Sequence, residues 1–197
     1  STFIIGKFNL PEVIDDLKMK KIYFKALLDR ASDADPDFLP ISKILTRKKS
    51  YIINPHHKVM KSIDKVFMHR KLVKKHFRLP KTILLPSFDQ DSRPGVQEED
   101  IRELGIPFVI KPSLFSGGGE GVIKSAESLY QIHEERRKNP HEKYLVQEKI
   151  YPRKIQNKRA WFRILWAYDR VIPTWWDDTT HIYHRVTKTD VERYNLL

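Results

Sequence analysis

The stretch from Pro107 to Val122 constrains the fold of this chain more than any other. It holds four of the seven glycines in the 197 residues, directly after an apolar run that ends at Lys111. The β-branched and aromatic residues Phe108–Ile110 predict a buried strand, and Pro112 prevents this run from continuing as a helix. A second apolar run after Gly121 predicts another strand. The unit is therefore a strand, a glycine-rich loop and a second strand.

This order of elements excludes several common phosphate-binding motifs. A P-loop requires Gly-Lys-Ser/Thr at the start of a helix, whereas Gly121 is followed by Val122 and Ile123. A dinucleotide-binding loop also continues into a helix, and the glycine loop of a protein kinase precedes its strand lysine. Glycines let backbone N–H groups approach an anion. The loop therefore favours a nucleotide phosphate site, and the alternative is a glycine-rich hairpin without a ligand.

The composition is that of a globular protein, with 40% hydrophobic and 31% charged residues. No apolar run approaches the roughly 18 residues that a membrane helix needs. The N-terminus also lacks the pattern of a secretion signal. The absence of cysteine excludes disulfides, thiol catalysis and cysteine-bound zinc. We expect a soluble, cytoplasmic protein with no membrane partner.

The net charge of +12 comes from one segment. Between Lys43 and Lys81 there are thirteen Lys and Arg residues and a single acidic residue, Asp64, while the rest of the chain is balanced. A basic stripe can bind the phosphates of nucleic acid, lipid or nucleotide. The alternative is a solvated helix face. Because few aromatic residues interrupt the stripe, nucleic acid is a possible partner but not the favoured one.

Apolar periodicity predicts a chain of alternating helices and short strands. Helices are expected near residues 10–17, 57–77, 98–104 and 125–139, and strands near 22–28, 51–53, 81–85, 144–150, 161–167 and 171–176. Ser125 is expected to cap the helix that follows the glycine loop. In the strand near 161–167, alternation places Arg163 on an apolar face, where a permanent charge requires an anion or a carboxylate.

Two clusters of possible metal ligands favour other roles. The carboxylates between Asp29 and Asp35 are typical of turns and helix caps, which we prefer to a divalent-ion site. The four histidines between His56 and His76 lack a compact metal spacing, and we expect each of them to be exposed to solvent. A polar segment, Asp89–Gly95, separates an N-terminal part with a linking helix (residues 1–88) from a nucleotide-binding part (residues 89–197).

The order of several motifs adds a family resemblance. The motifs are Ile53–Pro55, Ser62–Lys65, Leu79–Thr82, Phe108–Pro112, the glycine loop, Leu145–Ile150 and Arg163. Together they resemble the ATP-grasp superfamily, whose fold is that of glutathione synthetase, D-alanine–D-alanine ligase and ribosomal-protein glutamate ligases. The resemblance covers about residues 50–190. It implies an α+β ATP-grasp fold, with two α/β lobes and a mainly antiparallel sheet that holds the nucleotide.

The resemblance also implies roles for individual residues. Lys65 and Lys111 are expected to bind the nucleotide phosphates, and Arg163 is expected to be the catalytic residue that stabilises charge on the transferred phosphoryl group. The lid loop over the phosphates is expected to use Ser116, Gly117, Gly118, Gly119 and Gly121. The hinge that meets adenine is expected to use Gln147, Glu148, Lys149 and Ile150.

Two departures from the family pattern concern the polar and metal contacts. Trp161 stands where the family usually has an aspartate, two residues before the arginine. The late aspartate and Glu-x-Asn pair that bind two magnesium ions are not found, because Asp177, Asp178, Asp190 and Glu192 stand in turn-like or helical surroundings. ATP and Mg²⁺ are the expected cofactors, but no metal ligand is assigned. We expect the chain to be a truncated piece of a longer ligase.

The expected activity is that of an ATP-dependent carboxylate–amine ligase. A carboxylate, on a small molecule or a peptide, would take the γ-phosphoryl group and form an acyl-phosphate that an amine then captures. One alternative is an ATP-grasp small-molecule kinase of the inositol-phosphate type, in which the basic helix receives an anionic substrate. Another is a basic module that binds nucleic acid or another polyanion.

Overall fold

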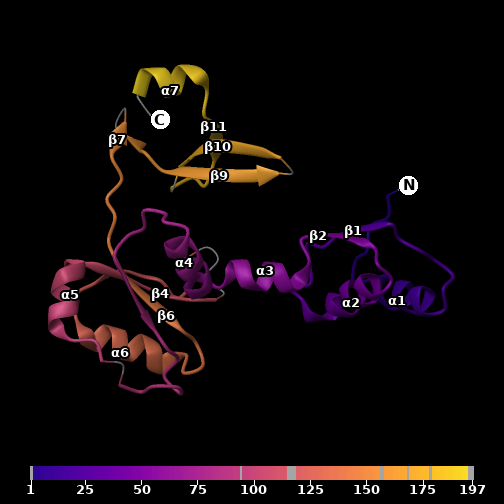
Figure 1. The fold of residues 1–197 in the computed structure, drawn as a ribbon, viewed down its shortest axis with the longest axis horizontal. Helices are drawn as coiled ribbons and strands as arrows, with labels where there is room; N and C mark the ends of the chain where they lie inside the picture. The colour runs from indigo at the N-terminus through magenta and orange to yellow at the C-terminus, as the bar shows by residue number, and fades with distance from the viewer. Residues whose placement is uncertain are drawn as a thin grey trace. The chain divides into compact units, whose positions relative to one another are not determined.

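Helices and short strands follow the apolar periodicity of the chain (Figure 1). The computed structural model describes residues 2–93, 95–114, 119–155, 158–167, 169–177 and 179–194. The chain divides into two compact units, Ser1–Lys149 and Ile150–Leu197. The predicted functional boundary after residue 88 stays a prediction, because compactness does not test it.

The first unit begins with a small lobe built on two parallel strands. Its elements are α1 (Leu10–Lys18), β1 (Ala26–Leu28), the 3-10 helix η1 (Pro36–Phe38), α2 (Leu39–Arg47) and β2 (Tyr51–Ile53). The predicted strand at 22–28 is thus confined to its last three residues. Apolar side chains of α1 and α2 form the core of this lobe, namely Leu10, Val13, Leu17, Ile41 and Leu45.

The long helix predicted from residue 57 to residue 77 is wrong, because the segment forms two helices. α3 (His56–Ile63) ends at Asp64, and α4 (Lys65–Lys74) begins directly after it. Asp64 has an extended backbone, and its side chain accepts a hydrogen bond from the backbone N–H of Phe67. A residue in this conformation is an N-cap, so it ends one helix and starts the next.

A four-stranded antiparallel sheet forms the centre of the first unit. Its order is β3 (Thr82–Leu85), β6 (Tyr144–Glu148), β4 (Phe108–Pro112) and β5 (Ile123–Ala126). Two helices lie in the connections between these strands, α5 (Glu98–Leu104) and α6 (Leu129–Lys138). Gly105 follows α5 with φ +88°, a backbone conformation that explains why a glycine ends this helix.

Alternation along the strands gives the sheet two different faces. The core face carries Phe108, Ile110 and Val146, which pack with Ile101 of α5 and Ile132 of α6. The opposite face is partly covered by α4, which contacts β6. Figure 1 accordingly shows α4 and α6 on opposite sides of β4 and β6.

Helix α6 starts three residues later than predicted. Ser125 belongs to β5, so its predicted role as the cap is wrong. Ser128 takes the N-cap position instead, and its backbone N–H donates to Gln131 Oε1 over 3.2 Å. Ser128 and Gln131 form the Ser-x-x-Gln capping box, which satisfies backbone donors at the first turn of the helix.

The buried guanidinium of Arg136 fixes the segment that follows β3. It donates to the backbone oxygens of Pro86, Ser87 and Asp91. Burial lowers the pKa of Arg136, although Asp91 and Tyr144 act in the opposite direction. The side chain is fully enclosed and stacks over the ring of Phe88.

The second unit contains a three-stranded antiparallel sheet. Its order is β11 (Tyr183–Arg185), β10 (Arg170–Trp176) and β9 (Phe162–Ala167), accompanied by the short pair β7 (Lys154–Ile155) and β8 (Lys158–Arg159) and by α7 (Lys188–Tyr194). A proline favours an edge strand or a bulge, but β10, which contains Pro173, is the middle strand of this sheet. Proline is accommodated because β11 pairs only with Thr174–Trp176, beyond Pro173.

The mixture of helices with mainly antiparallel sheets confirms the predicted α+β class. Within the described ranges, the helices are too short and too polar to traverse a bilayer.

Candidate functional site

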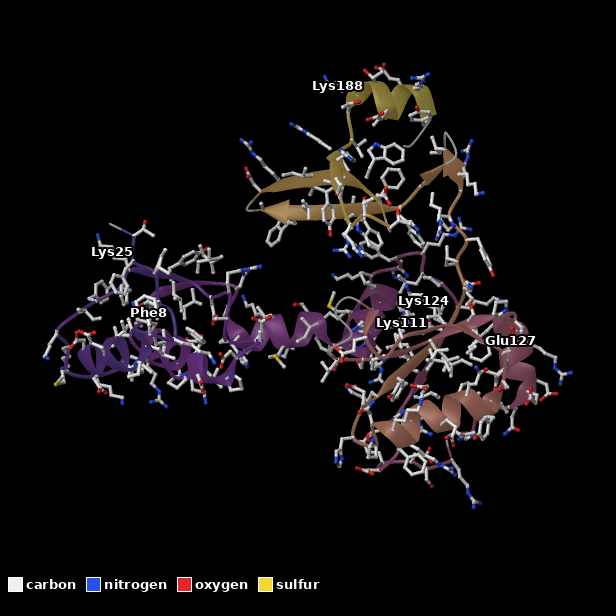
Figure 2. All side chains as sticks on the ribbon, turned by 180° about the vertical axis from the view of Figure 1, so that it is seen from behind. Phe8, Lys25, Lys111, Lys124, Glu127 and Lys188 are labelled. Atoms are coloured by element: carbon white, nitrogen blue, oxygen red, sulfur yellow. The ribbon has the colours of Figure 1, made fainter. Side chains whose placement is uncertain are left out.

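The face of the central sheet that lies opposite the core brings several predicted site residues together. The register pairs Lys111 with Leu145 across β4 and β6, and Thr82 with Gln147 across β3 and β6. Directly opposed residues project from the same face, and so do residues two apart on one strand. Lys111, Gln147 and Thr82 therefore share the face that α4 partly covers. Lys111 and its neighbour Lys124 of β5 are labelled in Figure 2.

Ser113 holds the start of α4 against the end of β4. Its backbone oxygen accepts hydrogen bonds from the backbone N–H of Lys65 over 2.9 Å and from Lys65 Nζ over 3.2 Å. Its hydroxyl oxygen accepts from the backbone N–H of Val66 over 3.0 Å. Ser113 and Val66 are both buried. These bonds place Lys65, the first residue of α4, beside the strand that carries Lys111.

Asp64 also connects the start of α4 to the sheet. Asp64 Oδ1 accepts from the Ser113 hydroxyl over 2.6 Å, and Asp64 Oδ2 accepts from Lys143 Nζ over 2.8 Å. Partial burial raises the pKa of Asp64, but hydrogen bonds from Lys143, Ser113 and the Phe67 N–H outweigh it and lower the pKa to about 2. The carboxylate is therefore ionised and hydrogen-bonded to the start of α4, to the residue that follows β4 and to the residue that precedes β6.

The charge of Lys65 acts on Lys111. Burial lowers the pKa of Lys111, and the charge of Lys65 lowers it further. Burial also lowers the pKa of Lys65, although Glu142 and Asp64 oppose this effect. In the described part of the chain, Lys111 has no carboxylate within ion-pair distance. Two neighbouring ammonium groups with incomplete compensation favour an anionic ligand.

The predicted hinge residues lie at the end of β6 and at the division between the two units. Gln147 Nε2 donates to Thr82 Oγ1 over 2.7 Å, and Glu148 Oε1 accepts from the backbone N–H of Lys81 over 2.7 Å. Lys149 ends the first unit and Ile150 begins the second. The side chains of Gln147 and Glu148 are thus bound to β3 and to the residue before it. Alternation also places them on opposite faces of the sheet.

Part of the predicted lid loop is described. Gly119 has φ +89° and Gly121 has φ +66°, the positive values expected of loop glycines. A Cβ atom at Gly121 would lie 3.3 Å from Pro112 Cγ, so a larger residue is disfavoured there. Ser116, Gly117 and Gly118 lie outside the described residues.

Arg163 lies in the second unit, on β9, and aromatic residues hold its side chain. Its Nη1 donates to the hydroxyl of Tyr183 over 2.7 Å. The guanidinium lies 4.6 Å from the ring centroid of Trp176 and 5.5 Å from that of Tyr183. The Trp161 ring packs against the Trp176 ring with centroids 6.4 Å apart. Cation–π contacts of this kind orient the guanidinium of Arg163 against the two aromatic rings.

The contribution of the contact between Arg163 and Tyr183 to the stability of the second unit can be measured. Replacing Tyr183 with phenylalanine removes the hydrogen bond but keeps the ring, and we expect it to lower the stability of the second unit by about 0.5–1 kcal/mol. All four tryptophans lie between residues 161 and 176, so tryptophan fluorescence during urea unfolding reports on this unit. Tyr130→Phe in the first unit is the control, and an unchanged fluorescence transition in Tyr183→Phe would contradict the expectation.

The carboxylates that were considered as metal ligands have local roles. Asp29 Oδ1 accepts from the backbone N–H groups of Ala31 and Ser32, which confirms the predicted turn. Asp177 binds the backbone N–H of Thr179, and Asp190 binds that of Thr187. In the ranges that the structure describes, no three His, Asp or Glu side chains converge on a possible metal position.

Sequence reasoning missed Ser113, Lys143 and His69 as members of this site. Lys143 and Ser113 meet Asp64 across 79 and 49 residues of chain, so no local pattern could reveal them. His69 lies one helical turn after Lys65, and partial burial and the charge of Lys111 lower its pKa. The signal for His69 was available, since positions i and i+4 share one face of a helix.

Comparison with known proteins identifies the fold. No protein-family model matches the chain, and no curated protein matches it. Among solved structures, a RimK-domain ATP-grasp protein from Sphaerobacter thermophilus DSM 20745 matches with a TM-score of 0.57 and 17% sequence identity. The match covers 95% of this chain and 74% of that protein. The chain therefore has the ATP-grasp fold, as the resemblance implied.

Two further solved structures match more distantly. D-alanine–D-alanine ligase from Helicobacter pylori matches with a TM-score of 0.49 and 12% sequence identity. The match covers 79% of this chain and 47% of that ligase. N5-carboxyaminoimidazole ribonucleotide synthetase, solved as an ADP complex, matches with a TM-score of 0.46 and 13% sequence identity. This match covers 88% of this chain and 56% of that enzyme.

Proposed function

We propose that this chain binds ATP and belongs to an ATP-dependent carboxylate–amine ligase. The observation that carries the proposal is the pair Lys65 and Lys111. Ser113 holds Lys65 beside the strand that carries Lys111, on the face of the sheet that α4 partly covers. Ammonium groups that lack full compensation suit a polyphosphate. The glycine loop that follows Lys111 can supply backbone N–H donors to the same ligand. The ATP-grasp fold supports this assignment.

The proposed reaction has two steps. A carboxylate oxygen of the substrate attacks the γ-phosphorus of ATP, the bond between the γ-phosphorus and its bridging oxygen breaks, and ADP leaves. An amine nitrogen then attacks the acyl carbon, inorganic phosphate leaves, and an amide forms. Lys65 and Lys111 would hold the phosphates, and Arg163 would stabilise negative charge on the transferred group. ATP-grasp enzymes work with Mg²⁺, but we assign no metal ligand and derive no step through the metal.

Trapping the acyl-phosphate tests this proposal directly. The chain is incubated with MgATP, a panel of carboxylic acids and hydroxylamine, which captures acyl-phosphates as hydroxamates. We expect ADP and hydroxamate in equal amounts, and no hydroxamate when ATP is omitted. A panel that yields ADP and a stable phosphorylated compound, with no hydroxamate, would overturn the ligase assignment.

The basic segment around α4 favours a second candidate, a kinase that acts on an anionic small molecule. Arg70, Lys71, Lys74, Lys75 and Arg78 are exposed, and no carboxylate in the described part of the chain pairs with them. Such a surface would attract an anionic substrate toward the site. The trapping experiment separates the two candidates, because a kinase leaves the phosphoryl group on its product.

A further inference from the structure

His69 lies on the face of α4 that meets the sheet. It follows Lys65 by four residues and Val66 by three, and these spacings place all three side chains on neighbouring positions of one helix face. Val66 is buried, and the backbone N–H groups of Lys65 and Val66 bind Ser113. His69 itself is partly buried. This face of α4 is therefore the one turned toward the end of β4.

Lys111 lies on the face of the sheet that α4 partly covers. It precedes Ser113 by two residues, so both residues project from the same side of the extended chain. Partial burial lowers the pKa of His69, and the charge of Lys111 lowers it further. The charge of Lys65 likewise lowers the pKa of Lys111. Three basic groups thus share one space between α4 and β4.

The acidic groups near these bases do not neutralise them. Asp64 is bound to Lys143 and Ser113. Glu142 and Asp64 both raise the pKa of Lys65, but neither is among the causes that shift the pKa of Lys111 or His69. In the ligand-free protein, burial and the charge of Lys111 therefore both disfavour the protonated imidazole of His69. An anion placed among the three groups reverses this effect, because it attracts the proton that Lys111 repels.

We propose that His69 is the third basic group of the phosphate site, and that it takes up a proton when a polyphosphate binds. This inference rests on the proposed nucleotide site and extends it to a coupling between nucleotide affinity and pH. The affinity for ATP should rise as the pH falls, down to the range in which His69 is already protonated in the free protein. One coupled proton changes the affinity by at most about tenfold per pH unit.

Calorimetric titration in pairs of buffers measures this proton directly. ATP is titrated into the wild-type chain, His69→Gln and the control His57→Gln at pH 6.5 and 7.5, in two buffers that differ in ionisation enthalpy. His57 is an exposed residue of the neighbouring helix α3. We expect the wild type and His57→Gln to take up more protons than His69→Gln, and to gain more affinity between pH 7.5 and pH 6.5. Subtracting His69→Gln removes the proton that ATP itself exchanges.

Equal proton uptake in the wild type and His69→Gln would overturn the inference while leaving the nucleotide site intact. If neither protein binds ATP, the proposed function fails, and titration with inorganic tripolyphosphate then decides the role of His69. His69-dependent proton uptake with tripolyphosphate would support a phosphate site with three basic groups, and its absence would overturn it. Histidine-ring NMR of the wild type, in which the His69 signals should move to the protonated position on ligand addition, gives the same answer without relying on a variant.

Discussion

Replacing Lys111 with alanine is expected to remove most of the protection that ATP gives this chain against thermal unfolding. Lys111 is partly buried on the face of the sheet that α4 partly covers, and the charge of Lys65 acts on it. In the described residues, no carboxylate pairs with Lys111. Charge-assisted contacts of this kind are worth several kcal/mol to an anionic ligand. We expect ATP binding to weaken about 100-fold, which corresponds to about 2.8 kcal/mol.

A thermal-shift assay with an ATP titration measures this effect. At an ATP concentration of about 100 times the wild-type Kd, ligand binding stabilises the wild type by about 2.7 kcal/mol, and a 100-fold weaker site by only about 0.4 kcal/mol. The unfolding temperature without ATP should not fall, because Lys111→Ala removes a charge that burial and Lys65 both disfavour. Lys25→Ala is the matched control, since Lys25 is an exposed lysine of the N-terminal lobe. Undiminished ATP protection in Lys111→Ala would refute the assignment of this site.

Replacing Asp64 with alanine is expected to destabilise the first unit by about 3 kcal/mol. The change removes the N-cap of α4 and the hydrogen bonds that Ser113 and Lys143 donate to the carboxylate. Losing an N-cap costs about 1 kcal/mol, and losing bonds to an ionised group in a partly buried site costs a further 2 kcal/mol or so. The start of α4, and with it Lys65, should also lose its fixed position, so ATP binding should weaken in parallel.

Circular dichroism and fluorescence separate the two units in this experiment. The first unit contains no tryptophan, so its unfolding in urea is followed by far-ultraviolet circular dichroism, while tryptophan fluorescence follows the second unit. Asp64→Ala should shift the transition of the first unit and leave the fluorescence transition in place. A loss below about 1 kcal/mol would mean that Asp64 does not fasten α4 to the sheet.

The pH dependence of stability isolates the charge of Asp64. Its pKa is lowered from 3.8 to about 2 in the folded chain, so its ionisation stabilises the fold above about pH 3.8, and this stabilisation is lost as the pH falls toward 2. The size of the shift corresponds to about 2 kcal/mol. Asp64→Asn keeps the shape and lacks the charge, so the stability difference between wild type and Asp64→Asn should shrink by this amount between pH 5 and pH 2. A constant difference would show that the charge contributes nothing.

The central sheet was largely predictable from short apolar runs. Phe108–Ile110 was predicted as a strand and is the first part of β4, and the run from Tyr144 contains β6. Their signals are local, because a buried strand needs only β-branched and aromatic residues bounded by turns. The lid role of the loop between these two strands stays a prediction, because Ser116, Gly117 and Gly118 lie outside the described residues.

The division of the basic helix could not be predicted in the same way. The apolar positions from His57 to Phe77 keep a helical period through Asp64, so the pattern indicates one helix. The break exists because Asp64 is held by Ser113 and Lys143, which are 49 and 79 residues away in sequence. Contacts of such separation leave no local pattern, and they override propensity once the chain is folded.

The sequence by itself determined the strand, glycine loop and strand around Lys111, the two lysines proposed for the phosphates, and the α+β class of the fold. The tertiary structure decided which groups meet those lysines. It bound Ser113 and Asp64 to the start of α4, placed His69 where the charge of Lys111 acts on it, and bound Gln147 to Thr82 of the neighbouring strand. The physical reason is that a strand or a glycine loop is specified by neighbouring residues, whereas the charge and hydrogen bonding of a site depend on which distant side chains the fold brings into contact.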